Sequence, residues 1–339
     1  MNSSIVSFIP RIGVSLPPVF FFMFALMFLD SYKLVKLRTV MFTILYGCCA
    51  ALVALVLNEN LSMSVIGRAL YVRYGGPVVE ETAKAACIVF LLRTKRIGFM
   101  VDAAIYGFAI GSGFAVIENI HYLWSHPDAD FLVWLIRGFG TAIMHGGTTA
   151  IFAVMSKSIS DVKGSGLVLT IAPGLVLAAA LHSFFNHFLL PPVLSTVSNL
   201  VVLPSVLLVV FKQSEKATRH WLGAGFDSDV EMLELIKRGD VSTTKIGMYL
   251  QALQDKFRSE VVADLLCYLR LYLELAVQAK GILLMRQAGF DVTPDLTVQE
   301  QFKELRYLGR SIGKTGKLAL APFIHTSSRN LWQLHTLSR

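Results

Sequence analysis

Long apolar runs alternate with short polar segments over residues 1–211 of the chain. Each run has the length that an α-helix needs to cross the hydrocarbon core of a bilayer, about 20 residues. The predicted membrane-spanning helices occupy residues 12–30, 39–57, 74–92, 101–124, 137–156, 166–190 and 192–211. The pattern therefore predicts an all-α fold, a polytopic membrane bundle of about seven transmembrane helices.

The pattern changes from residue 212 onward. Polar and charged residues recur at helical spacing, and one predicted helix carries an apolar stripe at three- and four-residue intervals. The stripe consists of Leu265, Leu269, Tyr272, Leu273 and Ala276. We therefore expect a cytosolic helical domain over residues 212–310. Residues 311–339 are basic and rich in Ser, Thr and Gly. We expect a tail there that is either flexible or lies on the anionic inner leaflet.

The composition is that of a membrane protein. Hydrophobic residues make up 54% of the chain and charged residues only 16%, with a mean hydropathy of +0.59. An ordinary soluble domain carries about 25% charged residues. The net charge of +8 comes from basic residues in short loops and in the C-terminal part. This distribution follows the positive-inside rule, so the expected partner is the lipid bilayer and not nucleic acid.

The basic residues also orient the predicted helices. Those that follow the first, third, fifth and seventh helices all fall on one side of the membrane. They are Lys33, Lys36, Arg38, Arg93, Lys95, Arg96, Lys157, Lys163, Lys212, Lys216 and Arg219. We therefore expect the N-terminus to lie outside the cell and the C-terminus to lie in the cytosol.

Ionisable and amide side chains interrupt four of the predicted membrane helices. Each charged group at membrane depth costs about 2.5–3.5 kcal/mol, and such groups normally face a bundle interior and serve a function. The candidate site residues are Glu80, Glu81, Glu118, His145, His182 and Asn186. On each of the four helices they begin about two turns from the expected outer end. We therefore expect one site, of a kind that activates water, in a layer near the outer face.

Spacing within the helices predicts separate roles for these residues. Glu80 and Lys84 lie four residues apart, and we expect them to form an ion pair. Glu81 is then left on a different face of the same helix as the candidate general base. His182 and Asn186 lie one turn apart on a single face, where they can orient a carbonyl group or stabilise an oxyanion.

Small residues mark the fourth predicted helix. Gly107, Gly111 and Gly113 form a stripe of the kind that lets membrane helices approach closely. We expect this stripe to hold Glu118 tightly against the neighbouring helices.

Four short motifs, one on each of four predicted membrane helices, carry a family resemblance. In chain order they are Glu80-Glu81-x-x-Lys84, Phe114-x-x-x-Glu118, His145-x-x-Thr148-Thr149 and His182-x-x-x-Asn186. They resemble the motifs of the PrsW family of bacterial intramembrane proteases. More distantly, they are similar to those of the CAAX prenyl endopeptidases and the APH subunit of γ-secretase. Lys84 and Glu118 stand where the CAAX pattern has an arginine and a histidine, which favours the PrsW branch. The resemblance covers about residues 12–211.

The resemblance implies an intramembrane endopeptidase of the bacterial cytoplasmic (inner) membrane. PrsW proteases cut single-pass membrane proteins such as anti-sigma factors near the outer face, which agrees with the layer expected above. The expected partner is therefore a single-pass membrane protein that serves as the substrate.

Two mechanisms remain open for the expected hydrolysis. In a glutamate mechanism, Glu81 activates the water, His182 and Asn186 stabilise the oxyanion, and no cofactor takes part. In a metal mechanism, Glu118, His145 and His182 hold Zn²⁺ and Glu81 is the base. The resemblance to the CAAX enzymes favours the metal-free mechanism.

Two other classes of function fit parts of the pattern. A proton- or metal-coupled transporter also uses buried Glu and His, but it places them along a path that reaches both faces. Here the polar groups cluster in the outer half. A non-catalytic scaffold like the APH subunit keeps the histidines, whereas the presence of Glu81 beside them argues for an enzyme.

The orientation is testable with reporters. A reporter fused after Lys212 should be cytosolic, because this position follows the seventh predicted helix on the basic side. A tag inserted at residues 127–130 should be accessible from outside in intact cells. The opposite result at either position would place the candidate site at the cytosolic face.

Overall fold

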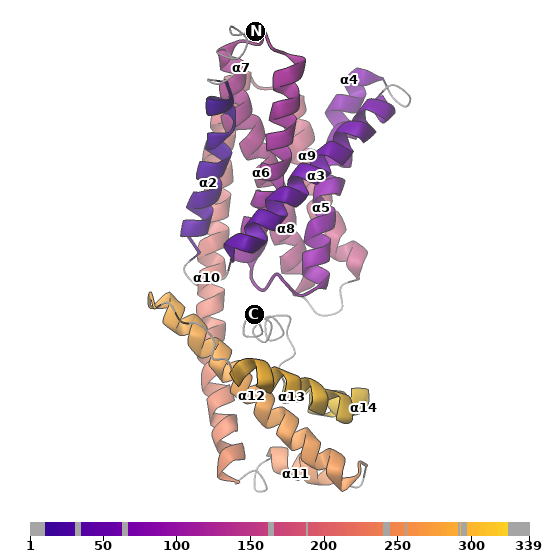
Figure 1. Cartoon of the computed structure of the whole chain (residues 1–339), viewed down its shortest axis with the longest axis vertical. Coiled ribbons are helices and arrows are strands. Elements are labelled where there is room, and N and C mark those ends of the chain that lie inside the picture. The colour runs from indigo at the N-terminus through magenta and orange to yellow at the C-terminus, as the bar shows by residue number, and fades with distance from the viewer. Residues whose placement is uncertain are drawn as a thin grey trace. The chain divides into compact units, whose positions relative to one another are not determined.

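A computed structural model describes residues 11–30, 35–62, 67–161, 166–187, 189–239, 245–254, 256–290, 292 and 297–324. The chain divides into two compact units, Met1–Ser214 and Glu215–Arg339 (Figure 1). The secondary structure is helical, with no strand among the described residues. The predicted all-α class is confirmed.

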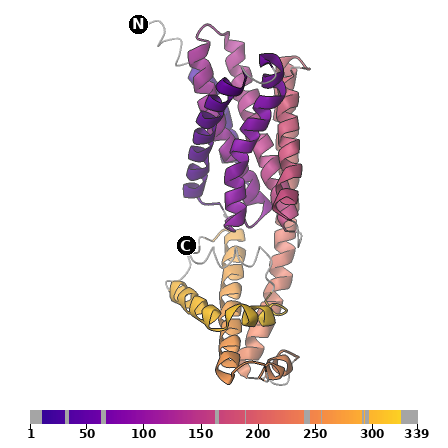
Figure 2. The same cartoon turned by 90° about the vertical axis from the view of Figure 1, so that its right-hand side faces the viewer.

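The first unit is a bundle of helices that run side by side (Figures 1 and 2). Its helices are α2 (Pro17–Phe28), α3 (Leu37–Ser62), α4 (Arg68–Leu70), α5 (Gly76–Arg93), α6 (Met100–Ser125), α7 (Phe131–Ile136), α8 (Ala142–Ser160) and α9 (Leu167–Asn186). Two π-helices lead into long helices: η1 (Tyr71–Gly75) precedes α5, and η2 (Arg137–Thr141) precedes α8. Helix α10 (Pro192–Arg238) begins in this unit, which ends at Ser214.

Among the described residues, five helices are long and apolar enough to cross a membrane. They are Arg11–Phe28, Leu37–Asn60, Met100–Ser125, Leu167–Asn186 and Pro192–Arg238. The two other predicted spans correspond to α5 and α8, which pack within the same bundle. These two helices carry several polar side chains, and those side chains face other helices: Glu81, Lys84 and His145 are all at most 2% exposed. The protein is therefore a membrane helix bundle whose polar groups point inward.

Helix α6 is the buried centre of the bundle and packs against α3 and α8. A methyl group added to Gly107 would lie 2.6 Å from the carbonyl oxygen of Thr149. Methyl groups on Gly111 and Gly113 would overlap the carbonyl oxygens of His145 and Ile44. The predicted small-residue stripe therefore brings the α6 backbone against α8 on one side and against α3 on the other.

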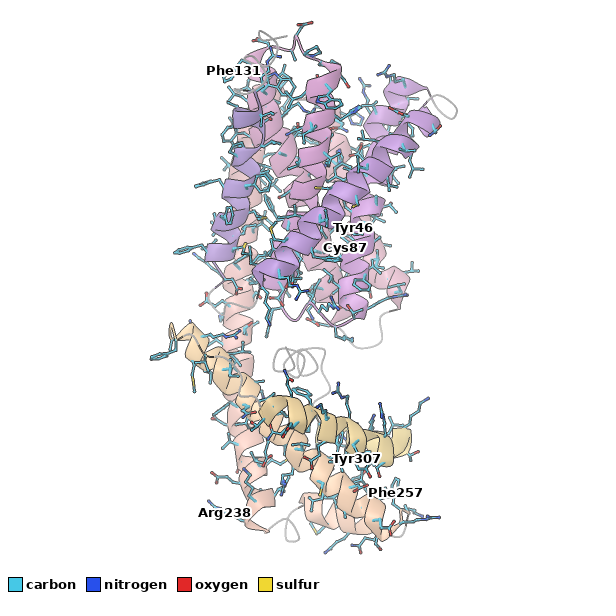
Figure 3. The ribbon with its side chains drawn as sticks, viewed as in Figure 1. Tyr46, Cys87, Phe131, Arg238, Phe257 and Tyr307 are labelled. Atoms are coloured by element: carbon cyan, nitrogen blue, oxygen red, sulfur yellow. The ribbon has the colours of Figure 1, made fainter. Side chains whose placement is uncertain are left out.

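Helices α3 and α5 are also joined by a polar contact across the bundle. The hydroxyl group of Tyr46, a residue of α3 labelled in Figure 3, donates a hydrogen bond of 3.0 Å to the Ala83 carbonyl of α5. The Cys48 thiol of α3 donates to the Gly113 carbonyl of α6 at 3.3 Å. These side chains satisfy hydrogen-bonding groups that lipid would leave without partners.

The second unit is helical, as predicted, but its boundaries differ from those expected. Helix α10 runs without a break past residue 211, and α11 (Lys245–Ala252), α12 (Ser259–Gln287), α13 (Thr297–Ser311) and α14 (Gly313–Leu320) follow. The predicted stripe of Leu265, Leu269, Tyr272, Leu273 and Ala276 is buried in its core.

The predicted tail, residues 311–339, begins within a part of the chain that is helical in the structure. Helix α14 packs against α12 and α13, and Ile312, Leu320 and Ile324 are buried. These three apolar residues lie among basic and small residues, which hid the helix in the composition of the segment. The helical unit therefore extends to Ile324, and residues 325–339 lie outside the described part of the chain.

The close packing of α6 predicts a specific loss of stability. In Gly111→Ala, the new methyl group overlaps the His145 carbonyl, so α6 and α8 must separate. Overpacking of this kind typically destabilises by about 1–3 kcal/mol. Thermal unfolding of the purified protein should therefore occur at a lower temperature. Gly13→Ala is the control, because no atom lies within 4 Å of its new methyl group. Equal unfolding temperatures for the two variants would contradict the packing.

Candidate active site

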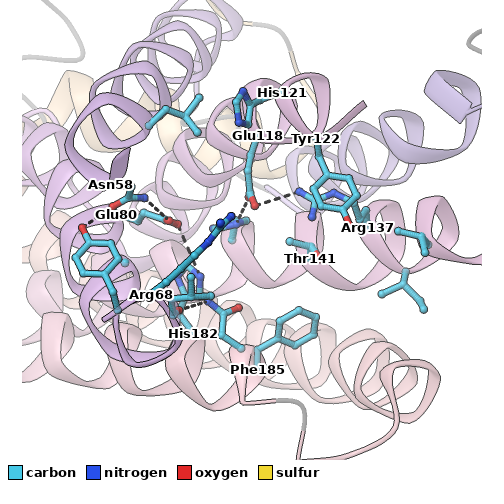
Figure 4. A pocket seen from close by; sticks show the side chains of 18 of the residues that line it. Asn58, Arg68, Glu80, Glu118, His121, Tyr122, Arg137, Thr141, His182 and Phe185 are labelled. Atoms are coloured by element: carbon cyan, nitrogen blue, oxygen red, sulfur yellow. Dashed lines mark hydrogen bonds and ion pairs between the residues drawn. The ribbon is translucent and has the colours of Figure 1, made fainter. Parts of the chain in front are cut away.

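A cavity of about 770 Å³ lies at one end of the first unit. Figure 4 shows side chains that line it. This volume lies in the range of ligand- and substrate-binding clefts. Five of the six predicted site residues line it: Glu80, Glu118, His145, His182 and Asn186. They come from the start of α5, the end of α6, the start of α8 and the end of α9. The predicted layer of polar groups therefore exists, and four helices contribute to it.

The two π-helices lie at the same end of the bundle. Residues of η1 and η2 contribute to the cavity wall, among them Tyr71 and Arg137. Helix α9 braces η1, because Ser183 and Asn186 donate hydrogen bonds of 2.6 and 3.2 Å to the carbonyl oxygens of Arg73 and Val72. π-Helical turns often occur at functional sites, where they alter the direction in which side chains point.

Lys84 occupies the centre of the polar layer and is fully buried. Its ammonium group contacts the Glu81 carboxylate at 2.6 Å and the Nδ1 atom of His145 at 3.0 Å. The same group lies 4.6 Å from the centre of the Phe114 ring, in a cation–π contact. Thr148 donates a further hydrogen bond of 3.2 Å to Glu81. The positive charge is thus matched by a carboxylate, a ring nitrogen and an aromatic face.

The imidazole rings of His145 and His182 lie on the cavity side of the buried Lys84–Glu81 pair. His182 contacts Glu81 through Nδ1 at 2.9 Å, and the two rings are perpendicular with centres 4.7 Å apart. Each ring turns its Nε2 atom toward a carboxylate of the cavity wall. For His145 that carboxylate is Glu118, at 2.6 Å, and for His182 it is Glu80, at 3.8 Å.

The hydrogen-bond network assigns a different tautomer to each ring. A lysine ammonium has no acceptor, so Nδ1 of His145 must accept its hydrogen bond and Nε2 carries the proton. That proton is donated to Glu118. The Glu81 carboxylate accepts from Nδ1–H of His182. In this tautomer the Nε2 lone pair of His182 faces Glu80 and the cavity.

A second cation holds the rim of the cavity. Arg137 donates to Glu118 at 3.1 Å and to Asn119 at 2.9 Å, and its guanidinium lies 4.1 Å from the centre of the Tyr122 ring (Figure 4). Glu118 is therefore fixed on one side by Arg137 and on the other by His145. A charge-assisted arrangement of this kind restricts the carboxylate to one orientation.

The predicted pair between Glu80 and Lys84 is wrong. Lys84 pairs with Glu81, three residues earlier on the side of α5 that faces the bundle. Successive helical residues are rotated by about 100°, so Glu80 points to the cavity instead. There it accepts a hydrogen bond of 3.1 Å from Asn58. Glu81, the predicted general base, is buried behind the rings and does not line the cavity.

Sequence reasoning missed the roles of two residues that hold the site, Asn58 and Arg137. Asn58 lies at the polar end of α3, where it resembles a loop residue, but it accepts from Tyr71 at 2.9 Å and orients Glu80. Arg137 gave a signal as an arginine beside an apolar segment, but its partner Glu118 lies on another helix. Contacts between helices of this kind do not follow from spacing within one helix.

A family model, the PrsW family intramembrane metalloprotease, matches residues 36–211. The chain belongs to the PrsW family. The matched range includes all six predicted site residues and ends before the second unit begins. No curated protein and no solved structure matches the chain. This PrsW protein is therefore a membrane-embedded peptidase, and the cavity built from α5, α6, α8 and α9 is its candidate active site.

The family description implies a metal ion, so the donors of the cavity can be compared with a metal site. Among the described residues, Glu80, His145 and His182 offer ligand atoms that all lie within 4.8 Å of one another. Glu80 thus takes the place of Glu118 in the predicted set of Glu118, His145 and His182. Two imidazoles and a carboxylate are chemically suitable for zinc.

The arrangement of these donors does not fit a site with three ligands. A metal ligand must present a lone pair, and both ring nitrogens of His145 are in use, on Lys84 and on Glu118. Of the three donors Glu80, His145 and His182, only the Glu80 carboxylate and Nε2 of His182 face the cavity with free acceptor capacity. Binding through His145 would require the loss of one of two short contacts beside a buried ammonium group.

The reversed roles of the two glutamates predict different stabilities for their variants. Glu81→Gln leaves the Lys84 ammonium buried without its carboxylate, and loss of one partner of a buried pair typically costs about 3–5 kcal/mol. Glu80→Gln keeps an acceptor for Asn58 at the cavity wall, so its unfolding temperature should stay near that of the wild type. Thermal unfolding of the two purified variants tests this difference. Similar unfolding temperatures would show that Lys84 does not depend on Glu81.

Proposed function

We propose that this PrsW protein hydrolyses peptide bonds of single-pass membrane proteins near the outer face of the bacterial cytoplasmic membrane. We further propose that a water molecule activated by Glu80 is the nucleophile and that anti-sigma-factor-like proteins are the substrate class. One observation carries this proposal: the Oε2 atom of Glu80 and the Nε2 atom of His182 face the same cavity 3.8 Å apart.

The distance between these atoms supports a shared water. A separation of 3.8 Å is too long for a direct hydrogen bond, and it lets one water molecule contact both acceptors. The water donates one hydrogen to Glu80 and the other to His182, which orients its oxygen lone pair toward the cavity. Glu80 then has the geometry of a general base. Asn58 supports it by holding the other carboxylate oxygen at 3.1 Å.

The remaining groups complete a balanced hydrolysis. The water oxygen attacks the carbonyl carbon as Glu80 accepts its proton. Asn186 lines the cavity and uses one amide hydrogen on Val72, so its second hydrogen is available for the developing oxyanion. Glu80 then returns the proton to the amine as the C–N bond breaks. His182, which faces the water with a lone pair, orients the nucleophile in place of the oxyanion role first expected for it.

The charge distribution supports the proposed orientation. The end of the bundle opposite the cavity carries Arg38 at the start of α3, Arg93 at the end of α5, Lys95 and Arg96 after it, and Lys157 near the end of α8. The segments α4, η1 and η2 at the cavity end carry fewer basic residues, namely Arg68, Arg73 and Arg137. Basic residues concentrate on the cytosolic side of membrane proteins. The cavity end then faces outward, and its apolar wall, which includes Leu55, Val133 and Phe185, suits an unwound apolar segment of a substrate.

Loss of Glu80 should make the substrate accumulate. In Glu80→Gln the amide cannot accept the proton of water, so uncut single-pass proteins should rise in the membrane fraction by quantitative proteomics. Asp128→Asn is a matched control, because this carboxylate is exposed and does not line the cavity. It should give the wild-type profile. Wild-type cleavage in Glu80→Gln would contradict the assignment of the base.

A further inference from the structure

The Lys84 ammonium group is linked to both histidines of the site, although it does not line the cavity. It donates directly to Nδ1 of His145, and it contacts the Glu81 oxygen that also accepts from Nδ1 of His182. A single buried cation thus lies behind two rings that present their Nε2 atoms to the cavity. Among the described residues, neither ring makes another hydrogen bond at Nδ1.

We propose that Lys84 is the positioning residue of this site, the fixed cation that sets the tautomers of His145 directly and of His182 through Glu81. This proposal rests on the proposed peptide hydrolysis. The positive charge at the centre of the site is then that of a lysine side chain, whereas the family description implies a metal ion.

The assignment follows from the donor and acceptor capacities of the groups. The ammonium can only donate, so it excludes a proton from Nδ1 of His145 and directs Nε2–H toward Glu118. By pairing with Glu81, it holds the carboxylate oxygen that accepts the hydrogen bond from His182. The lone pair of His182 then faces Glu80. Without the cation, His145 loses the contact that selects its tautomer, and Glu81 loses the partner that holds its carboxylate beside His182.

A purely structural role for Lys84 makes a different prediction. A buried lysine that only neutralises Glu81 is replaceable by an uncharged pair, and such replacements are often neutral for stability. Lys157 offers a comparison within the same unit. It is also buried, and it pairs with Asp161 at 2.7 Å at the end of the bundle opposite the cavity.

The ring protonation can be measured directly. The full-length protein, with ¹⁵N-labelled histidine rings, is reconstituted in lipid bilayers and studied by solid-state NMR, with assignment by His145→Gln and His182→Gln. We expect His145 to carry its proton on Nε2 and His182 on Nδ1. In Lys84→Met, the His145 ring should show a mixture of the two tautomers. A proton on Nδ1 of His145 in the wild-type protein would overturn the proposal.

Kinetics of the uncharged double variant separate positioning from stability. Glu81→Gln/Lys84→Met should unfold close to the wild-type temperature, since neither buried charge is left alone. Its kcat on a reconstituted single-pass substrate should still fall about 100-fold or more, the range for a misplaced acid–base group, with KM changed far less. Lys157→Met/Asp161→Asn, the matched control, should keep wild-type kcat. A wild-type kcat in Glu81→Gln/Lys84→Met would show that Lys84 is only structural.

The two proposals fail in different ways. If Glu80→Gln cleaves normally, the proposed water activation is wrong, and the ring tautomers remain an independent test of Lys84. If Glu80→Gln is inactive but the Glu81→Gln/Lys84→Met variant is fully active, hydrolysis stands and the role of Lys84 is wrong.

Discussion

A lysine ammonium buried in an apolar helix bundle imposes strict requirements on its surroundings. Removing such an ion from water costs several kcal/mol, and the loss is recovered only if every hydrogen of the ammonium finds a partner. Lys84 meets this condition with Glu81, His145 and the face of Phe114. These three residues come from α5, α8 and α6, so the contacts that stabilise the charge also fix the relative positions of the three helices.

The close approach of those helices depends on small residues. Gly111 places the α6 backbone against the His145 carbonyl. This contact lies about two helical turns from Glu118, an α6 residue that faces the cavity. Glu118, seven residues further along α6, can then reach His145 across a short gap of 2.6 Å. The glycine stripe and the polar network therefore support each other: tight backbone packing brings the polar groups together, and their contacts resist separation of α6 from α8.

Much of this arrangement was predictable, because depth in a membrane helix follows from residue number. Counting along the helices placed Glu118, His145 and His182 in one layer, and in the structure these side chains are neighbours. The choice between Glu80 and Glu81 as partner of Lys84 was not predictable. Spacings of three and four residues both allow an ion pair, and only the neighbouring helices decide which carboxylate is buried. The link from Arg137 to Glu118 and the support of Glu80 by Asn58 also join helices distant in sequence.

The metal content of active protein tests this account most directly. A centre organised by Lys84, with both nitrogens of His145 engaged, needs no metal ion to orient its groups. Protein purified without added metal and assayed on a reconstituted single-pass substrate should cleave at full rate with far less than one metal ion per chain by elemental analysis. Strong chelators should leave the rate unchanged. Near-stoichiometric zinc, with activity lost on chelation and restored by Zn²⁺, would contradict the account.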